Sequence, residues 1–179
     1  MIYFIRHGEA AARWGDHPNP SLSEAGFKQA ERVASWLADK DIQSIVSSPM
    51  QRCQDTAAAF SKASGLPVKT EAGVTEIPTP NDVTDRVTWL RELMSGSWNS
   101  APPIVTDWRE QLITTTKSLT GNTAVFSHFV AINAIVGYLE NTDTVTVVRP
   151  DYCSVTVLEL VAGGLKLIQK AGEAETKIL

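Results

Sequence analysis

Short apolar runs that resemble buried strands alternate along this sequence with segments of helical periodicity, and this alternation is the strongest constraint on the fold. Residues 2–5 form a continuous apolar run, as expected for a strand that is buried on both faces. Similar runs follow at 42–46 and 123–126. The segments between them carry apolar residues at spacings of three and four, which is typical of helices with one buried face. The pattern predicts an α/β fold: a single three-layer domain with a mostly parallel central sheet and helices on both faces.

Turn and capping signals place the expected elements along the chain. Strands are predicted at 2–5, 42–46, around Val68, and at 123–126, 145–148, 154–160 and 165–168. Helices are predicted at 50–62, 82–94, 104–119 and 130–139, after a first helix that ends near Leu37. Ser21 and Glu24 have the spacing of a capping box at the start of that first helix. The residues expected on its buried face are Phe27, Ala30, Val33, Ala34 and Leu37.

The size and charge of the chain exclude several classes of protein. A length of 179 residues corresponds to one domain, and we expect residues 1–179 to form it. Sixteen Lys and Arg against twenty Asp and Glu give a formal net charge of −4, which argues against nucleic-acid binding and against a basic membrane-surface protein. No apolar stretch approaches the ~20 residues of a membrane helix, and the N-terminal run is too short for a signal peptide.

Two cysteines, Cys53 and Cys153, are too few to form a disulfide framework. We expect both to be reduced thiols, which is the usual state in the cytoplasm. The expected location is therefore cytoplasmic. The sequence does not predict an oligomeric state.

Polar residues suited to phosphate chemistry follow three of the predicted strands. Arg6 and His7 follow the first strand. Arg52 lies shortly after the second strand, and His128 lies just after the third. Because ligands bind outside the carboxyl ends of parallel strands, these side chains are expected to converge on one crevice. Arginine matches phosphate oxygens bidentately, and imidazole acts as a nucleophile or exchanges protons, so the combination suits phosphoryl transfer.

Several short motifs occur in a recognisable order between residue 1 and about residue 137. They are Arg6-His7-Gly8-Glu9, Leu22-Ser23-Glu24-Ala25-Gly26 with Gln29-Ala30, Ser48-Pro49-Met50-Gln51-Arg52 with Thr56-Ala57, Glu76-Ile77 and Ser127-His128. This set resembles the motifs of the histidine phosphatase superfamily, also called the phosphoglycerate mutase-like proteins. The resemblance implies the phosphoglycerate mutase-like fold and membership of the small phosphatase branch.

The resemblance also implies a two-step mechanism for phosphomonoester hydrolysis. His7 would attack the phosphorus atom and form a phosphohistidine. Arg6, Arg52 and His128 would hold the phosphoryl oxygens. Glu76 would protonate the leaving oxygen and then act as a base toward water. The scheme requires no metal and no other cofactor, and it implies a small phosphorylated substrate or a phosphoprotein as partner.

Several positions near these motifs depart from the family pattern or need a separate interpretation. Ala10 stands where a hydroxyl residue usually follows the Glu, and Arg13 stands where a polar Asn is expected. Arg13 is expected to bind phosphate in place of that hydroxyl or to hold a second anionic group of the substrate. Phe129 follows the second histidine, where Gly is frequent, and its ring is expected to narrow or cover the pocket. His17 is expected to be a solvated loop residue, and Glu9 to organise its loop.

Other functions remain open at this stage. A 2,3-bisphosphoglycerate-dependent phosphoglycerate mutase resembles this chain at the motifs, but it carries a longer segment between the residues corresponding to Glu76 and His128. A non-catalytic module that binds phosphorylated ligands would not need His7. A metal hydrolase is disfavoured because no close-set pair of histidines occurs. A cysteine phosphatase needs an arginine six positions after its cysteine, and neither Cys53 nor Cys153 has one.

Overall fold

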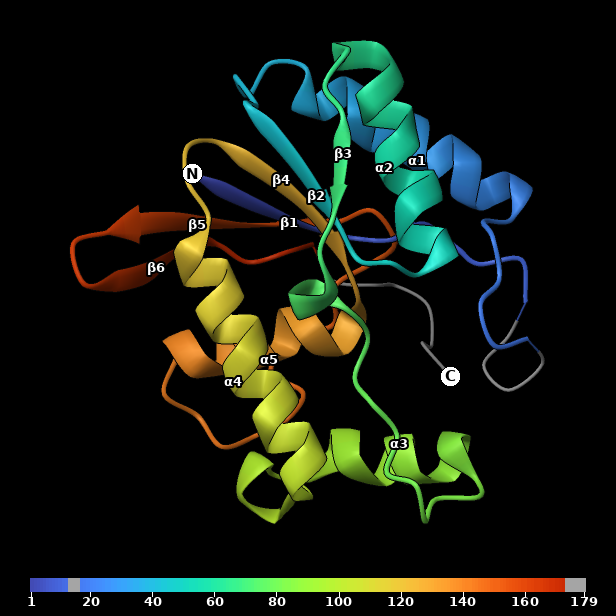
Figure 1. Ribbon diagram of the computed structural model, residues 1–179, viewed down its shortest axis with the longest axis vertical. Helices are drawn as coiled ribbons and strands as arrows, with labels where there is room; N and C mark the ends of the chain where they lie inside the picture. The colour runs from blue at the N-terminus through green and yellow to red at the C-terminus, as the bar shows by residue number, and fades with distance from the viewer. Residues whose placement is uncertain (13–16, 173–179) are drawn as a thin grey trace.

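The computed structural model describes residues 1–12 and 17–172, and its central element is a six-stranded sheet (Figure 1). The strands are β1 (Ile2–Arg6), β2 (Ser44–Ser47), β3 (Val68–Thr70), β4 (Thr123–Ser127), β5 (Val155–Val161) and β6 (Gly164–Gln169). Their order across the sheet is β3-β2-β4-β1-β5-β6. The four strands from β3 to β1 are parallel, whereas β5 is antiparallel to both of its neighbours. The expectation of a mostly parallel sheet is confirmed.

Helices cover both faces of this sheet, as the alternating pattern predicts (Figure 1). The helices are α1 (Glu24–Leu37), α2 (Gln51–Ser64), α3 (Arg86–Ser95), α4 (Pro103–Ser118) and α5 (Phe129–Leu139), and two 3₁₀ turns are η1 (Ala72–Val74) and η2 (Trp98–Ser100). Helices α1 and α2 pack on one face, and α4 and α5 on the other. The result is the three-layer α/β architecture expected from the sequence.

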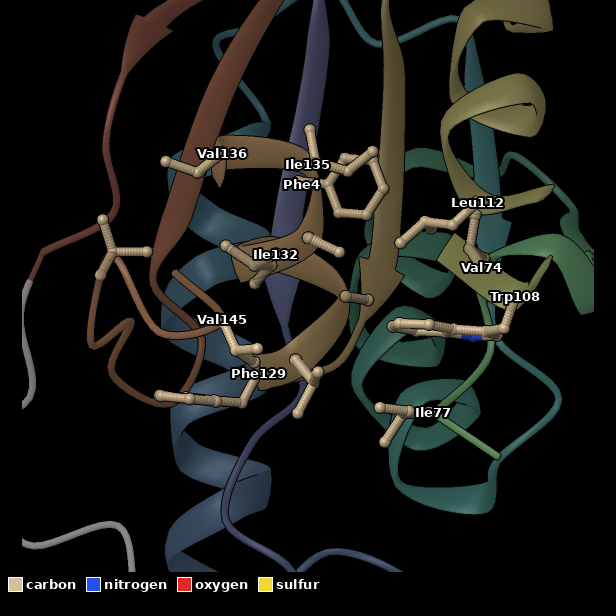
Figure 2. Packing of buried hydrophobic residues seen from close by; sticks show 14 of the residues in the cluster. Phe4, Val74, Ile77, Trp108, Leu112, Phe129, Ile132, Ile135, Val136 and Val145 are labelled. Atoms are coloured by element: carbon tan, nitrogen blue, oxygen red, sulfur yellow. The ribbon is translucent and has the colours of Figure 1, made fainter. Parts of the chain in front are cut away.

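Successive side chains of β1 enter two separate apolar clusters, one on each face of the sheet. Ile2 and Phe4 belong to the larger cluster with α4 and α5, and Figure 2 shows Phe4 there with Ile135 of α5. Tyr3 and Ile5 belong to the cluster with α1 and α2. Burial of each such side chain contributes roughly 1.5–3 kcal/mol. Because both faces of the sheet are covered, β1 is apolar without interruption until its carboxyl end.

The start of α1 differs from the capping box expected at Ser21. The N-cap is Ser23, whose hydroxyl accepts a hydrogen bond from the Gly26 N–H at 3.0 Å. Ser21 instead donates to Asp55 Oδ2 at 2.6 Å, so its side chain is used to join the loop to α2. Phe27, expected on the buried face, is 47% exposed. Gly26 lies on the buried face of α1 instead. A glycine is required at this position because a Cβ atom would clash with the Glu9 carbonyl oxygen.

The strand predicted at 145–148 is wrong. Val145 and Val148 are buried in the larger cluster, which explains the apolar pattern, but this segment pairs with no strand of the sheet. Its backbone is satisfied by a side chain instead: Asn133 Oδ1 accepts from the N–H groups of Val147 and Val148, at 2.8 and 2.9 Å. The side-chain amide of Asn133 thus supplies the hydrogen-bond acceptor that a neighbouring strand would otherwise provide.

Candidate active site

The carboxyl ends of three adjacent parallel strands bring the candidate residues together. Arg6 at the end of β1 is in register with Ser127 at the end of β4, so His7 and His128 leave the sheet side by side. The centroids of their rings are 5.4 Å apart, and the rings are inclined at 63°. Arg52 reaches the same place from the first turn of α2, which follows β2.

The ring of His7 is held in one tautomer by the backbone of Gly8. Its Nδ1 lies 2.7 Å from the Gly8 carbonyl oxygen, which only accepts, so Nδ1 carries the proton. Nε2 therefore has a free electron pair, and it accepts a hydrogen bond from Arg52 Nε at 3.2 Å. Burial holds the pKa of His7 well below its usual value, and the neighbouring His128, Arg52 and Arg6 lower it further. The imidazole is consequently neutral near pH 7, with Nε2 as its nucleophilic atom.

Arg52 links the other candidate residues to one another. Its Nη2 donates to Glu76 Oε2 at 3.0 Å and lies 3.2 Å from His128 Nδ1. Glu76 Oε2 is also 3.4 Å from His128 Nδ1. These side chains are nearly buried, with 8% of the Arg52 side chain and 10% of the Glu76 side chain exposed. One guanidinium thus contacts the candidate nucleophile, the candidate acid and the second histidine.

Glu76 is positioned by the segment that follows η1. Its Oε1 accepts from the Ile77 N–H at 3.1 Å, which fixes the carboxylate plane. The segment is attached to the sheet by Ser127, whose hydroxyl donates to the Val74 carbonyl oxygen at 2.8 Å. Because Ser127 ends β4 directly before His128, the carboxylate and the second histidine are positioned by the same strand.

His128 is completely buried at the N-cap of α5. Its Nε2 lies 2.8 Å from Ser48 Oγ and 3.4 Å from Cys53 Sγ. Burial lowers the pKa of His128 well below its usual value, and Arg52 is the next largest cause, followed by Arg6 and Arg86. The second histidine is therefore also neutral near pH 7.

Arg6 is 3% exposed and is held largely by groups near the start of β5. Its Nη1 donates to the Pro150 carbonyl oxygen at 2.9 Å, and its guanidinium carbon lies 4.0 Å from the centroid of the Tyr152 ring. Burial lowers the pKa of Arg6, whereas Tyr152 and Asp151 oppose that shift. The ring of Phe129 lies 5.4 Å from the guanidinium carbon, so this ring packs against Arg6 and the larger cluster.

Two charged or aromatic groups near the site were not predicted from the sequence. Tyr152 contacts Arg6, and its ring centroid is 6.1 Å from that of His7. Arg86, the first residue of α3, donates to Thr79 Oγ1 at 2.7 Å and adds positive charge around His128. No motif marks either residue, because both are brought to the site by segments distant from the strand ends.

The loop after β1 shows how the remaining candidates are placed. Glu9 Oε1 accepts from the Ser23 hydroxyl at 2.6 Å, so Glu9 organises the loop, as expected. His17 is exposed, and its Nδ1 accepts from the Asn19 N–H at 3.1 Å. Arg13 lies outside the described residues, so its expected contact with phosphate stays a prediction.

Within residues 1–12 and 17–172, no group of three or more His, Cys, Asp or Glu side chains is arranged to hold a metal ion. No helix in the same part of the chain has the length and apolar character needed to cross a membrane.

Comparison with known proteins gives one family and several relatives. The model of the histidine phosphatase superfamily, branch 1, matches residues 2–100. The chain is 38% identical to the uncharacterized protein Rv0525 of Mycobacterium tuberculosis over 80 residues. This alignment covers 42% of this chain and 40% of that protein. It is 30% identical to the probable phosphoglycerate mutase GpmB of Yersinia pestis over 115 residues. This second alignment covers 58% of this chain and 54% of that protein. The matches thus span about half the length of these relatives or less.

Among solved structures, the chain is similar to the mycobacterial glucosyl-3-phosphoglycerate phosphatase Rv2419c. The TM-score is 0.73, and the alignment covers 97% of this chain and 99% of that chain. The sequence identity is 19%, so this likeness shows a shared fold.

Proposed function

The chain belongs to branch 1 of the histidine phosphatase superfamily, and from this premise we propose that residues 1–179 are one catalytic domain that hydrolyses phosphomonoesters without a metal ion. The observation that carries the proposal is the state of His7. Its Nδ1 proton is held by the Gly8 carbonyl oxygen, and its Nε2 electron pair faces Arg52 beside the ring of His128. A neutral imidazole with a fixed tautomer among arginines is suited to attack a phosphorus atom.

In the first step, His7 Nε2 attacks the phosphorus atom. The N–P bond forms as the P–O bond to the leaving group breaks, and the protonated carboxyl of Glu76 gives its proton to the leaving oxygen. Arg6, Arg52 and His128 stabilise the charge that spreads over the three transferring oxygens.

In the second step, water attacks the phosphorus atom of the phosphohistidine. The carboxylate of Glu76 takes a proton from the water, and the electron pair of the broken N–P bond returns to His7 Nε2. Inorganic phosphate leaves, and Glu76 is again protonated for the next cycle. Every proton that moves is held by Glu76, the substrate or water, so the Nδ1 proton of His7 stays in place throughout.

The substrate in this proposal is a small phosphorylated molecule or a phosphoprotein. The size and charge of the chain favour neither nucleic acid nor a membrane as partner. Two reduced thiols, Cys53 and Cys153, are consistent with a cytoplasmic location.

A phosphoglycerate mutase is the second candidate, because the chain is similar to a probable mutase over 58% of its length. A mutase must keep the phosphohistidine from water until it is passed to a second substrate position. Incubation with 3-phosphoglycerate and 2,3-bisphosphoglycerate separates the two activities. A mutase yields 2-phosphoglycerate, whereas the proposed phosphatase yields inorganic phosphate.

The proposal is tested by trapping the covalent intermediate. The full chain is mixed with a ³²P-labelled phosphomonoester in the presence of EDTA, quenched within milliseconds and separated from free label. We expect label on the protein that is stable in alkali and lost in acid. His7→Ala should abolish both label and turnover, and His17→Ala, which changes an exposed histidine, is the matched control. Binding of phosphate without turnover by the wild type would instead indicate a non-catalytic module.

A further inference from the structure

The segment 150–154, directly before β5, makes most of the contacts that fix Arg6. The Pro150 carbonyl oxygen accepts from Arg6 Nη1 at 2.9 Å, and the Cys153 N–H donates to the Arg6 carbonyl oxygen at 3.0 Å. Cys153 has a φ of 56°, a conformation that few side chains favour. The backbone of this segment therefore turns sharply at the point where the ring of Tyr152 meets the guanidinium.

The guanidinium of Arg6 lies close to two aromatic rings. Its central carbon is 4.0 Å from the Tyr152 centroid and 5.4 Å from the Phe129 centroid, both within the ~6 Å range of a cation–π interaction. Such an interaction is stronger when the cation is removed from water, and Arg6 is 3% exposed. The Nε atom of Arg6 is buried and has no hydrogen-bond partner among the described residues. The two rings therefore lie against a guanidinium whose Nη1 is bonded to Pro150 and whose Nε has no such partner in the described structure.

We propose that Tyr152 is a positioning residue, whose ring holds the Arg6 guanidinium in the orientation that stabilises the transferring phosphoryl group. The inference rests on the proposed function, because it assigns Arg6 to that step. The same ring borders the candidate nucleophile, with 6.1 Å between its centroid and that of His7. Tyr152 itself neither attacks nor exchanges a proton in this scheme.

The position of Tyr152 separates this role from a general role in stability. Tyr152 is only partly buried, and it belongs to neither of the two apolar clusters. Replacement of its ring should therefore leave the core intact and act mainly on Arg6.

The first test compares Tyr152→Leu with Tyr152→Phe in the full chain, with a phosphomonoester as substrate. We expect Tyr152→Leu to lower kcat by about 10- to 30-fold, with a smaller change in KM, because charge stabilisation is needed most in the transition state. Tyr152→Phe keeps the ring and should restore kcat to within about threefold of wild type. Tyr138→Leu is the matched control, since Tyr138 of α5 is exposed and its ring contacts Lys117 of α4 in the same way that Tyr152 contacts Arg6.

The second test asks whether Tyr152 acts through Arg6. In an Arg6→Lys background, Tyr152→Leu should lower kcat by less than about twofold, because the group that it positions is already changed. The same factor of loss in both backgrounds, or an unchanged kcat in Tyr152→Leu, would overturn the inference. If Tyr152→Leu does not fold by circular dichroism, Tyr152→Met replaces it in the same cycle.

A binding measurement keeps this inference distinct from the proposed function. Calorimetry compares inorganic phosphate binding to His7→Ala with its binding to His7→Ala/Tyr152→Leu. Weaker binding by the double variant supports the role of Tyr152 even if the wild type forms no phosphohistidine. Equal binding in the two variants rejects it.

Discussion

The hydroxyl of Thr56 connects the first turn of α2 to the loop that follows β1. Its Oγ1 donates to the Arg52 carbonyl oxygen at 2.6 Å and accepts from the Gly8 N–H at 3.0 Å. Thr56 is completely buried, and Gly8 supplies the carbonyl that holds the His7 proton. Thr56→Val removes the hydroxyl with almost no change of shape, so it tests what this connection contributes.

The expected magnitude follows from which group loses its partner. The Arg52 carbonyl still has the helical N–H of residue 56, so loss of the hydroxyl donor has a small effect there. The Gly8 N–H is left buried without an acceptor, which costs about 1–3 kcal/mol. For a chain of this size each kcal/mol lowers Tm by about 2–4 °C, so the expected decrease is roughly 2–12 °C. We also expect a lower kcat, because the Gly8 carbonyl that orients His7 is less firmly held.

Thr116→Val is the matched control for this prediction. Thr116 is also completely buried in a helix, and its hydroxyl donates to the Leu112 carbonyl oxygen at 2.7 Å, four residues earlier. In the described structure it accepts no bond from another segment, so its loss should cost less than about 1 kcal/mol. Urea unfolding and steady-state kinetics give both readouts. If the two variants lose equal stability and Thr56→Val keeps the kcat of wild type, the reasoning from the Gly8 N–H is refuted.

Two other predictions concern pH and a buried amide. Because burial lowers the pKa of His7 and His128 in the folded state, the unfolded chain binds more protons below about pH 6.5. The free energy of unfolding should therefore fall as pH decreases from 7 to 5, by up to about 1.4 kcal/mol per histidine per pH unit, while kcat/KM persists below pH 6.5. A pH series of urea titrations measures the first effect, and a stability that rises toward pH 5 would contradict it. Asn133→Leu should destabilise the chain by about 2–5 kcal/mol, since the buried N–H group of Val148 and the partly buried N–H group of Val147 lose their acceptor. Thermal melting tests this, and a change below 1 kcal/mol would show that the segment finds other partners.

The parts of the fold and site that the sequence predicted depend on local signals. The buried run at 2–5 predicts a strand, and adjacent parallel strands must end at one edge, so His7 and His128 are brought together by topology alone. Their chemical roles were implied by the family resemblance and remain proposals. Glu76 was placed by its motif, and the hydrogen bond between Ser127 and Val74 explains how its segment reaches the strand end.

The features that the sequence did not predict depend on contacts between distant segments. Tyr152 contacts Arg6 in a turn where Cys153 has a positive φ, which no local pattern indicates. The segment 145–148 has the apolar character of a strand, but its hydrogen bonds go to the side chain of Asn133. In both cases the deciding contact is tertiary, so periodicity alone gave no indication of it.

The contacts of Arg52 have a consequence for the end of the catalytic cycle. This guanidinium donates to His7 Nε2 and to Glu76 Oε2. Inorganic phosphate that binds to Arg52 must replace these two hydrogen bonds. Part of the binding energy between phosphate and arginine is therefore offset by the loss of the bonds to His7 and Glu76, which re-form when phosphate leaves. If the proposed hydrolysis takes place here, we expect this exchange of contacts to weaken the binding of the product phosphate and so to limit product inhibition.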